Sequence, residues 1–211
     1  LLLVTYRSPV LWLIPFGVVA IADQLAAVLA TQALLALGMT WDQSTIGILS
    51  VLVFGAGTDY SLLLISRYRD ELRRVEDRFA AMRVALARTA ESILVSSVTV
   101  VLGLLTLLLS LVPSTRGLGV ACAIGVVIAA AFALVLLPAV LVLFGRWVFW
   151  PRVPQVGDPT LVEAERSLWH RIGQRVAARP GIFIFVTVLL LLAMSSGVTQ
   201  IKSGLSQADQ F

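Results

Sequence analysis

Charge, cysteine and histidine are all scarce in this chain. Charged residues make up 13% of its 211 residues and hydrophobic residues 59%, whereas a soluble domain carries about 25% charge. The lipid bilayer is therefore the expected solvent. The single cysteine, Cys122, excludes an intrachain disulfide and is expected to be a small core residue. The single histidine, His170, is expected on a surface helix rather than as a proton carrier.

Several motifs are also missing. The sequence contains no Gly-x-x-x-x-Gly-Lys-Ser/Thr phosphate loop, which excludes an ATP motor of that kind. It contains no cluster of cysteines and histidines, so we expect neither a metal nor a cofactor. The net charge of +4 has a topological explanation and does not indicate nucleic acid as a partner. The chain starts at Leu1 without methionine and stops at Phe211, so we expect a piece of a longer protein.

Five long apolar stretches predict an all-α transmembrane bundle. Each is long and apolar enough to cross a bilayer as a helix. Residues 1–145 form the predicted N-terminal bundle, and residues 200–211 are expected outside the membrane. The five predicted spans lie near 10–38, 45–66, 91–111, 117–144 and 181–199.

The arginines predict the orientation of these spans. Fourteen of the sixteen Lys and Arg residues fall on one side when the 67–90 and 146–180 connections share that side. An excess of positive charge marks the cytoplasm, so both connections are expected there. The 146–180 connection should contain an amphipathic helix. The 67–90 connection should form an elbow helix on the membrane surface, because apolar residues recur at helical spacing: Val75, Phe79, Met82 and Leu86.

Asp59 stands inside the apolar run 48–65. A carboxylate at that depth costs several kcal/mol, so acids in membrane spans are functional candidates by default. Burial favours the neutral carboxyl group until water or a partner reaches it. Asp59 is therefore a candidate proton carrier that loads on one side and releases on the other. The structural alternative is a permanently protonated residue that only holds helices together.

The surroundings of Asp59 suggest partners. Asp59 lies about 10 Å inside the membrane from Ser66. Three hydroxyl residues of the next span lie at a similar depth: Ser96, Ser97 and Thr99. Of these, Ser97 and Thr99 are the candidate hydrogen-bond partners for the carboxyl group. Tyr60 points about 100° away from Asp59 around the helix, so it should address a different helix. Gly55 and Gly57 should let another helix approach closely.

A second acid, Asp23, lies nearer the outer end of its span and is not level with Asp59. It suits an outer access vestibule and a helix-packing role equally well. The run from Gly55 to Asp59 faintly resembles the Gly-x-Gly-Asp motif of intramembrane aspartyl proteases. Thr58 breaks that spacing, and a second aspartate at the same depth is missing, so a protease is disfavoured.

Two motifs carry a resemblance to a known family. Residues 54–60, Phe-Gly-Ala-Gly-Thr-Asp-Tyr, and 65–72, Ile-Ser-Arg-Tyr-Arg-Asp-Glu-Leu, resemble the fourth transmembrane helix of the MmpL branch of the RND transporters. Shorter matches extend this similarity over nearly the whole chain, from the end of the second helix to the seventh. Residues 204–211 look like the start of the second extracytoplasmic porter domain.

The resemblance implies a multi-pass protein of the plasma (inner) membrane that exports lipids or other hydrophobic compounds with the proton gradient. It implies that Asp59 and Tyr60 form one half of a proton relay. The second half of the same polypeptide would supply the other Asp-Tyr pair. Membrane lipids and the hydrophobic substrate would be the other partners, with a homo-oligomer left open. The alternative is a non-transporting scaffold or sensor on the same fold, with Asp59 as structural glue.

Overall fold

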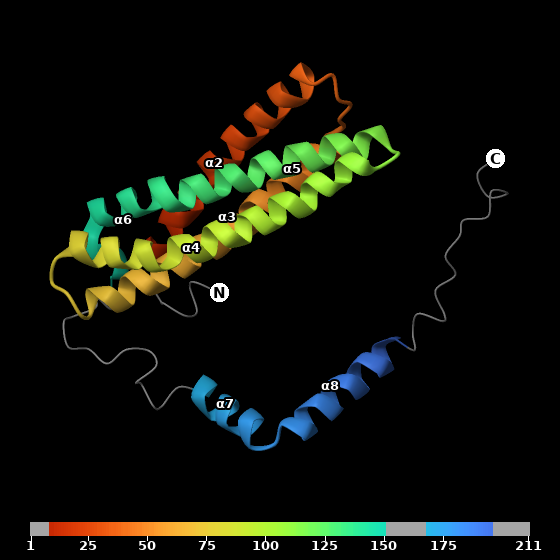
Figure 1. Cartoon of the computed structure of the whole chain (residues 1–211). Coiled ribbons are helices and arrows are strands. Elements are labelled where there is room, and N and C mark those ends of the chain that lie inside the picture. Colours follow the sequence, from red (N-terminus) through yellow and green to blue (C-terminus); the bar gives the residue numbers. More distant parts are fainter. Residues whose placement is uncertain (1–8, 151–167, 196–211) are drawn as a thin grey trace. The chain divides into compact units, whose positions relative to one another are not determined.

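The structure, a computed structural model, describes residues 9–150 and 168–195. The chain divides into two compact units, Leu1–Thr160 and Leu161–Phe211. Every element of the described residues is a helix (Figure 1), which confirms the predicted all-α class.

The first unit is a bundle of long helices. Its α-helices are α2 (Pro9–Ala36), α3 (Gln43–Leu72), α4 (Arg78–Leu105), α5 (Pro113–Ala131) and α6 (Leu137–Phe144). A 3-10 turn, Thr106–Leu109, extends α4, a π-helical turn, Phe132–Leu136, joins α5 to α6, and a 3-10 turn, Gly145–Phe149, follows α6.

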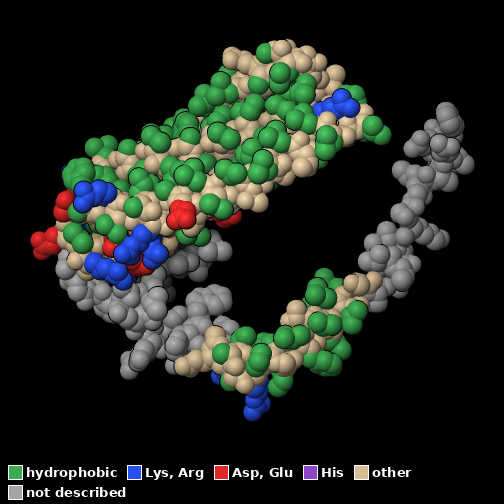
Figure 2. Space-filling view, in the orientation of Figure 1, with side chains coloured by type: hydrophobic (Ala, Val, Ile, Leu, Met, Phe, Trp, Pro, Cys, Tyr) green, Lys and Arg blue, Asp and Glu red, His purple; other side chains and the backbone are tan. Residues whose placement is uncertain are grey.

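These helices make four segments that are long and apolar enough to cross a membrane. Each overlaps one of the first four predicted spans. The segments are Trp12–Ala36, Gln43–Leu72, Arg78–Leu109 and Pro113–Phe149. Hydrophobic side chains cover most of the visible face of the bundle, while Lys and Arg side chains gather where α3 and α4 join (Figure 2). The protein is therefore a polytopic membrane protein, as its composition predicts.

The 67–90 connection, where the sequence predicts an elbow helix on the membrane surface, forms no separate helix, and its position at a membrane surface stays a prediction. Instead, α3 continues to Leu72, and α4 begins at Arg78 and runs directly into the third span. The reason is packing: Tyr68 and Leu72 are fully buried in the core at the end of α3. The side chain of Asp77 caps α4 by accepting hydrogen bonds from the amides of Phe79 and Ala80 at 3.0 and 3.3 Å.

Small residues bring the helices of the bundle together. Alanines of α2 and α5, with the free thiol of Cys122, pack into one core cluster against Leu49 and Val53 of α3. A Cβ atom placed at Gly125 of α5 would collide with the side chains of Leu49 and Val53. Such close contacts are typical of helices that pack within a membrane.

The fourth span is continuous, but it contains an irregular turn that the sequence analysis did not predict. The π-helical turn over Phe132–Leu136 ends just before Pro138. Proline has no backbone N–H and clashes with the carbonyl four residues earlier, so it disturbs a regular α-helix. The turn places Ala133 beside Tyr60 in a small buried cluster.

The second unit contains α7 (Leu168–Ala178) and α8 (Pro180–Ser195). Helix α7, which includes His170, lies within the predicted linker 146–180. Helix α8 is an apolar helix of 16 residues, and all but its first residue, Pro180, lie within the predicted span 181–199. Residues 151–167 and 196–211, with the predicted porter-domain segment, lie outside the described residues.

Candidate functional site

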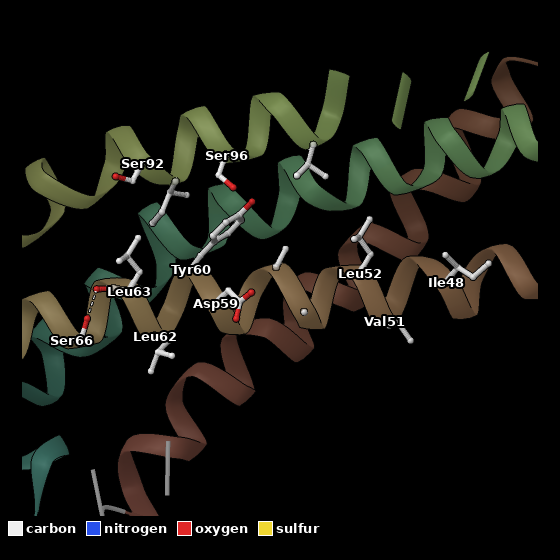
Figure 3. Close-up of a pocket in the computed structure, with 14 residues that line it drawn as sticks. Ile48, Val51, Leu52, Asp59, Tyr60, Leu62, Leu63, Ser66, Ser92 and Ser96 are labelled. Carbon is white, nitrogen blue, oxygen red and sulfur yellow. Dashed lines mark hydrogen bonds between the residues drawn. The ribbon is translucent and has the colours of Figure 1, made fainter. Parts of the chain in front are cut away.

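Asp59 and Tyr60 are neighbours on α3, and their side chains lie in different surroundings. Tyr60 is buried, with 7% of its surface exposed, and packs against Ile93 of α4 and against Ala130 and Ala133. Asp59 is exposed on the bundle and faces a groove (Figure 3). Consecutive helical residues point about 100° apart, which explains the separation and agrees with the expectation from the sequence.

The groove lies between α3 and α4 and has a volume of about 900 Å³. Most of its lining is apolar, and Asp59 is the one ionisable acid among the residues that line it. Hydroxyl groups of Ser66, Ser92 and Ser96 supply further polar atoms. Ser66 donates its hydroxyl proton to the carbonyl of Leu63 at 2.9 Å, so that proton is used within its own helix (Figure 3).

Tyr60 is fixed by a short hydrogen-bond chain. Its hydroxyl oxygen lies 2.9 Å from Oγ of Ser97 on α4. Oγ of Ser97 also lies 2.7 Å from the carbonyl oxygen of Ile93. A carbonyl can only accept, so it takes the one hydroxyl proton of Ser97, and the Tyr60 hydroxyl then donates to Ser97. These two hydrogen bonds link α3 to α4 at the inner wall of the groove.

The structure thus separates the two predicted hydrogen-bond partners. Ser97 meets Tyr60 rather than Asp59. Thr99 is exposed, does not line the groove, and donates its hydroxyl proton to the carbonyl of Val95 at 2.9 Å. Residues two apart on a helix point about 200° apart, so matching depth alone could not place both hydroxyls on one neighbour.

Ser92 and Ser96 are the hydroxyl-bearing residues of α4 that line the groove, and Ser92 was missed from the sequence. The signal was available, because residues spaced i and i+4 share one face of a helix. Ser96 and Asp59 point into the same space in Figure 3.

Within the described bundle, residues 12–150, the carboxyl group of Asp59 makes no hydrogen bond or ion pair with any side chain. Gly55, one turn earlier on α3, leaves open space in the groove, since a Cβ atom there would meet nothing within 4 Å. At Gly57, by contrast, a Cβ atom would lie 2.8 Å from Cγ2 of Val19 on α2. Only Gly57 therefore serves the close helix approach predicted for both glycines within the described bundle.

Asp23 lies apart from this groove. Its side chain is buried on α2, with 6% of its surface exposed, and Oδ1 has no hydrogen-bond partner. It is not among the residues that line the groove around Asp59. Among the described residues, no group of three or more His, Cys, Asp and Glu side chains is arranged to hold a metal ion.

The described bundle therefore combines four membrane-length segments with an apolar groove that one carboxylic acid, Asp59, lines, and these features define a polytopic membrane protein. Residues 1–183 match the profile of the MMPL family. The chain therefore belongs to the MMPL family, which confirms the resemblance seen in the sequence.

Individual relatives point the same way. The chain is 48% identical to the putative membrane protein ActII-3 of Streptomyces coelicolor, over 100% of this chain and 30% of that protein. It is 36% identical to the apo-petrobactin exporter of Bacillus anthracis, over 96% of this chain and 29% of that protein. It is 30% identical to the probable transport protein MmpL10 of Mycobacterium leprae, over 92% of this chain and 19% of that protein. The chain thus spans less than a third of the length of each of these relatives.

Proposed function

We propose that this chain is part of the membrane domain of a secondary active transporter, an exporter rather than an enzyme, and that Asp59 carries the proton that drives it. The observation behind this proposal is the position of Asp59. It is the one carboxylic acid in an open, mostly apolar groove, and no side chain of the described bundle, residues 12–150, pairs with it. Membership of the MMPL family and the names of two relatives, an exporter and a probable transport protein, support the transport function.

The groove couples proton binding to structure. A charged carboxylate needs water or a cation, and an apolar groove that closes over it would remove both. A neutral carboxyl group tolerates closure much better. Protonation of Asp59 therefore favours a closed, dry groove, and loss of the proton favours an open, hydrated one. A ligand, here the proton, shifts such an equilibrium by its different affinity for the two states.

Tyr60 holds the wall against which the groove would close. Its hydrogen bond to Ser97 links α3 to α4 on the buried side, while the adjacent Asp59 remains on the open side. We assign Tyr60 to positioning Asp59 and setting the distance between the two helices. Loss of its hydroxyl group should alter proton coupling without removing the proton-binding group.

The remaining parts of the proposal follow the family resemblance. A second half of the same polypeptide would cover the mouth of the groove with its own Asp-Tyr pair. The arginine-rich end of the bundle would face the cytoplasm of a plasma (inner) membrane. The substrate would be a lipid or another hydrophobic compound.

The test uses full-length protein in liposomes made from the lipids of its own host, so that a lipid substrate is present without being identified. An imposed pH gradient should collapse faster with the protein, and entrapped pyranine reports the internal pH. Asp59→Asn should reduce this protein-dependent proton flux at least about tenfold, because an amide cannot carry the proton. Ser66→Ala, which changes a hydroxyl already bonded within its own helix, is the matched control in the same groove and should retain the flux.

The scaffold alternative gives the opposite pattern. If Asp59 only holds helices together, Asp59→Asn should lower the melting temperature in detergent, and proton flux should fall only with the amount of folded protein. Proton flux that survives in folded Asp59→Asn would contradict the relay.

A further inference from the structure

A second groove lies between α4 and α6, where the Lys and Arg side chains gather (Figure 2). Its volume is about 410 Å³. One charged residue, Arg78, stands at the start of α4 in this groove, and the rest of the lining is apolar. The apolar lining includes Phe79, Met82, Pro138, Val142 and Leu143.

Arg78 is held in place by its neighbours. The central carbon of its guanidinium group lies 5.2 Å from the centre of the Phe79 ring, within the range of a cation–π contact. On another side it lies against Gly145, where a Cβ atom would come within 3.2 Å of Nη1 and 3.4 Å of Cδ. Gly145 also has φ of 61°, a backbone conformation that favours glycine. The turn after α6 therefore leaves space that the Arg78 side chain uses.

The groove extends from this charged group toward the apolar interior of the bundle. Along α4, Met82 lies about 6 Å deeper than Arg78, and Met82 is 5% exposed at the floor of the groove. Exposed Trp147 and Trp150 follow Gly145 closely in the chain, and tryptophans of this kind lie at the level of lipid headgroups. Arg78 is thus at headgroup depth, with apolar space beside it at the depth of acyl chains.

The local charge favours an anion. Seven arginines and four acids lie between Arg67 and Arg88. Two of the acids are already engaged: Glu71 forms an ion pair with Arg88 at 2.9 Å, and Asp77 caps α4. An arginine fork binds phosphate in a bidentate manner, and its charge at the membrane surface attracts anionic lipid.

We propose that the α4–α6 groove binds an anionic phospholipid, with its phosphate on Arg78 and the upper part of one acyl chain against Met82, Pro138 and Val142. This site is separate from the groove that contains Asp59, and it does not depend on the proton-relay proposal. It would fix the start of α4 relative to α6 at the membrane surface.

The test compares two lipids with identical acyl chains on the delipidated full-length protein in detergent. Phosphatidylglycerol should bind more tightly than phosphatidylcholine, as counted by native mass spectrometry over a titration. Arg78→Ala should weaken phosphatidylglycerol binding at least about tenfold, the loss expected when one charge-assisted hydrogen bond is removed. Arg78→Lys should restore part of it, because lysine keeps the charge but lacks the fork. Arg74→Ala, which removes an exposed arginine at the same end but outside the groove, is the matched control and should change binding less than twofold.

A second variant tests the acyl-chain part of the groove. Ala139→Phe fills the groove from an exposed position and leaves Arg78 unchanged, so it should also weaken phosphatidylglycerol binding. Equal binding of the two lipids would overturn the proposal, as would equal losses with Arg78→Ala and Arg74→Ala. Competition by inorganic phosphate alone as effective as that by the lipid would show a simple anion site and would overturn it too.

Discussion

Helices α4 and α5 lie side by side in the same bundle and are packed very differently. In the most apolar stretch of the fourth span, which begins with α5, 44% of the residues are buried, against 11% in the span that begins with α4. Helix α5 lies against α2, α3 and α4 through glycine and alanine contacts. Helix α4 leaves most of its apolar face open, and both grooves described here lie along it. The close-packed side gives the bundle its shape, and the open side holds Asp59 and Arg78, the groups that we propose bind a proton and a lipid.

The largest effect on stability should come from the close-packed side. Gly125→Ala places a methyl group against Leu49 and Val53 and should destabilise the bundle by about 2 kcal/mol through overpacking. Gly55→Ala is its control, because open space surrounds that position and alanine favours a helix over glycine by about 1 kcal/mol. Thermal unfolding in detergent should show a lower melting temperature for the first variant and an unchanged or higher one for the second. Equal effects would mean that the two sides do not differ in packing.

Tyr60→Phe tests the hydrogen bond that joins α3 to α4 beside the groove of Asp59. The change removes the hydrogen bond from Tyr60 to Ser97 and should cost about 1 kcal/mol of stability. Ser97→Ala should cost a similar amount, and the double variant should cost less than the sum because both changes break one interaction. Additive losses in this double-mutant cycle would show that the two hydroxyl groups are not coupled.

The ion pair between Glu71 and Arg88 should contribute less. The Arg88 side chain is 50% exposed, which weakens the interaction through solvent screening, although Glu71 is buried. We expect a coupling energy of about 0.5 kcal/mol from a cycle of Glu71→Gln and Arg88→Gln. A coupling that persists in high salt at full strength would contradict the expected screening.

The smallest effect should come from the exposed N-cap of α3. Hydrogen bonds from the hydroxyl of Ser44 and the amide of Thr45 lower the pKa of Asp42 below its ordinary value of 3.8. A lowered pKa in the folded state gives stability that is present above pH of about 4 and lost as the pH falls through the folded value. In Asp42→Asn, the melting temperature should therefore fall slightly less steeply as the pH is lowered from 5 to about 3. A pH profile identical to that of the unchanged protein would show that this cap contributes nothing measurable.

The sequence was most informative where one helix determines the outcome. Four of the five predicted spans match membrane-length segments of the described residues, and the 100° between Asp59 and Tyr60 correctly predicted that they face different surroundings. The sequence was least informative where the outcome depends on how one helix packs against another. The apolar spacing after Val75 predicted a separate elbow helix, whereas α4 begins at Arg78 and runs without a break into the third span. Their similar depth in the membrane predicted that Ser97 and Thr99 would both reach Asp59. The rotation of α4 instead turns Ser97 toward Tyr60 and Thr99 toward the exposed surface.

The openness of the groove could not be predicted from the residues around Asp59. They suggested a carboxyl group surrounded by hydroxyl partners, and the described bundle instead leaves it facing open space. The physical reason is that a groove is open or closed according to which other segments cover its mouth. The sequence of one span does not specify those segments.

The central claim, that Asp59 binds and releases a proton, is tested most directly by infrared titration of its carboxyl band. The full-length protein in lipid would be compared with Asp59→Asn across the accessible pH range. We expect a protonated-carboxyl band that appears and disappears reversibly with pH, is absent from Asp59→Asn, and changes in Tyr60→Phe. A band assigned to Asp59 that remains at every pH would mean a permanently neutral residue and would contradict the account.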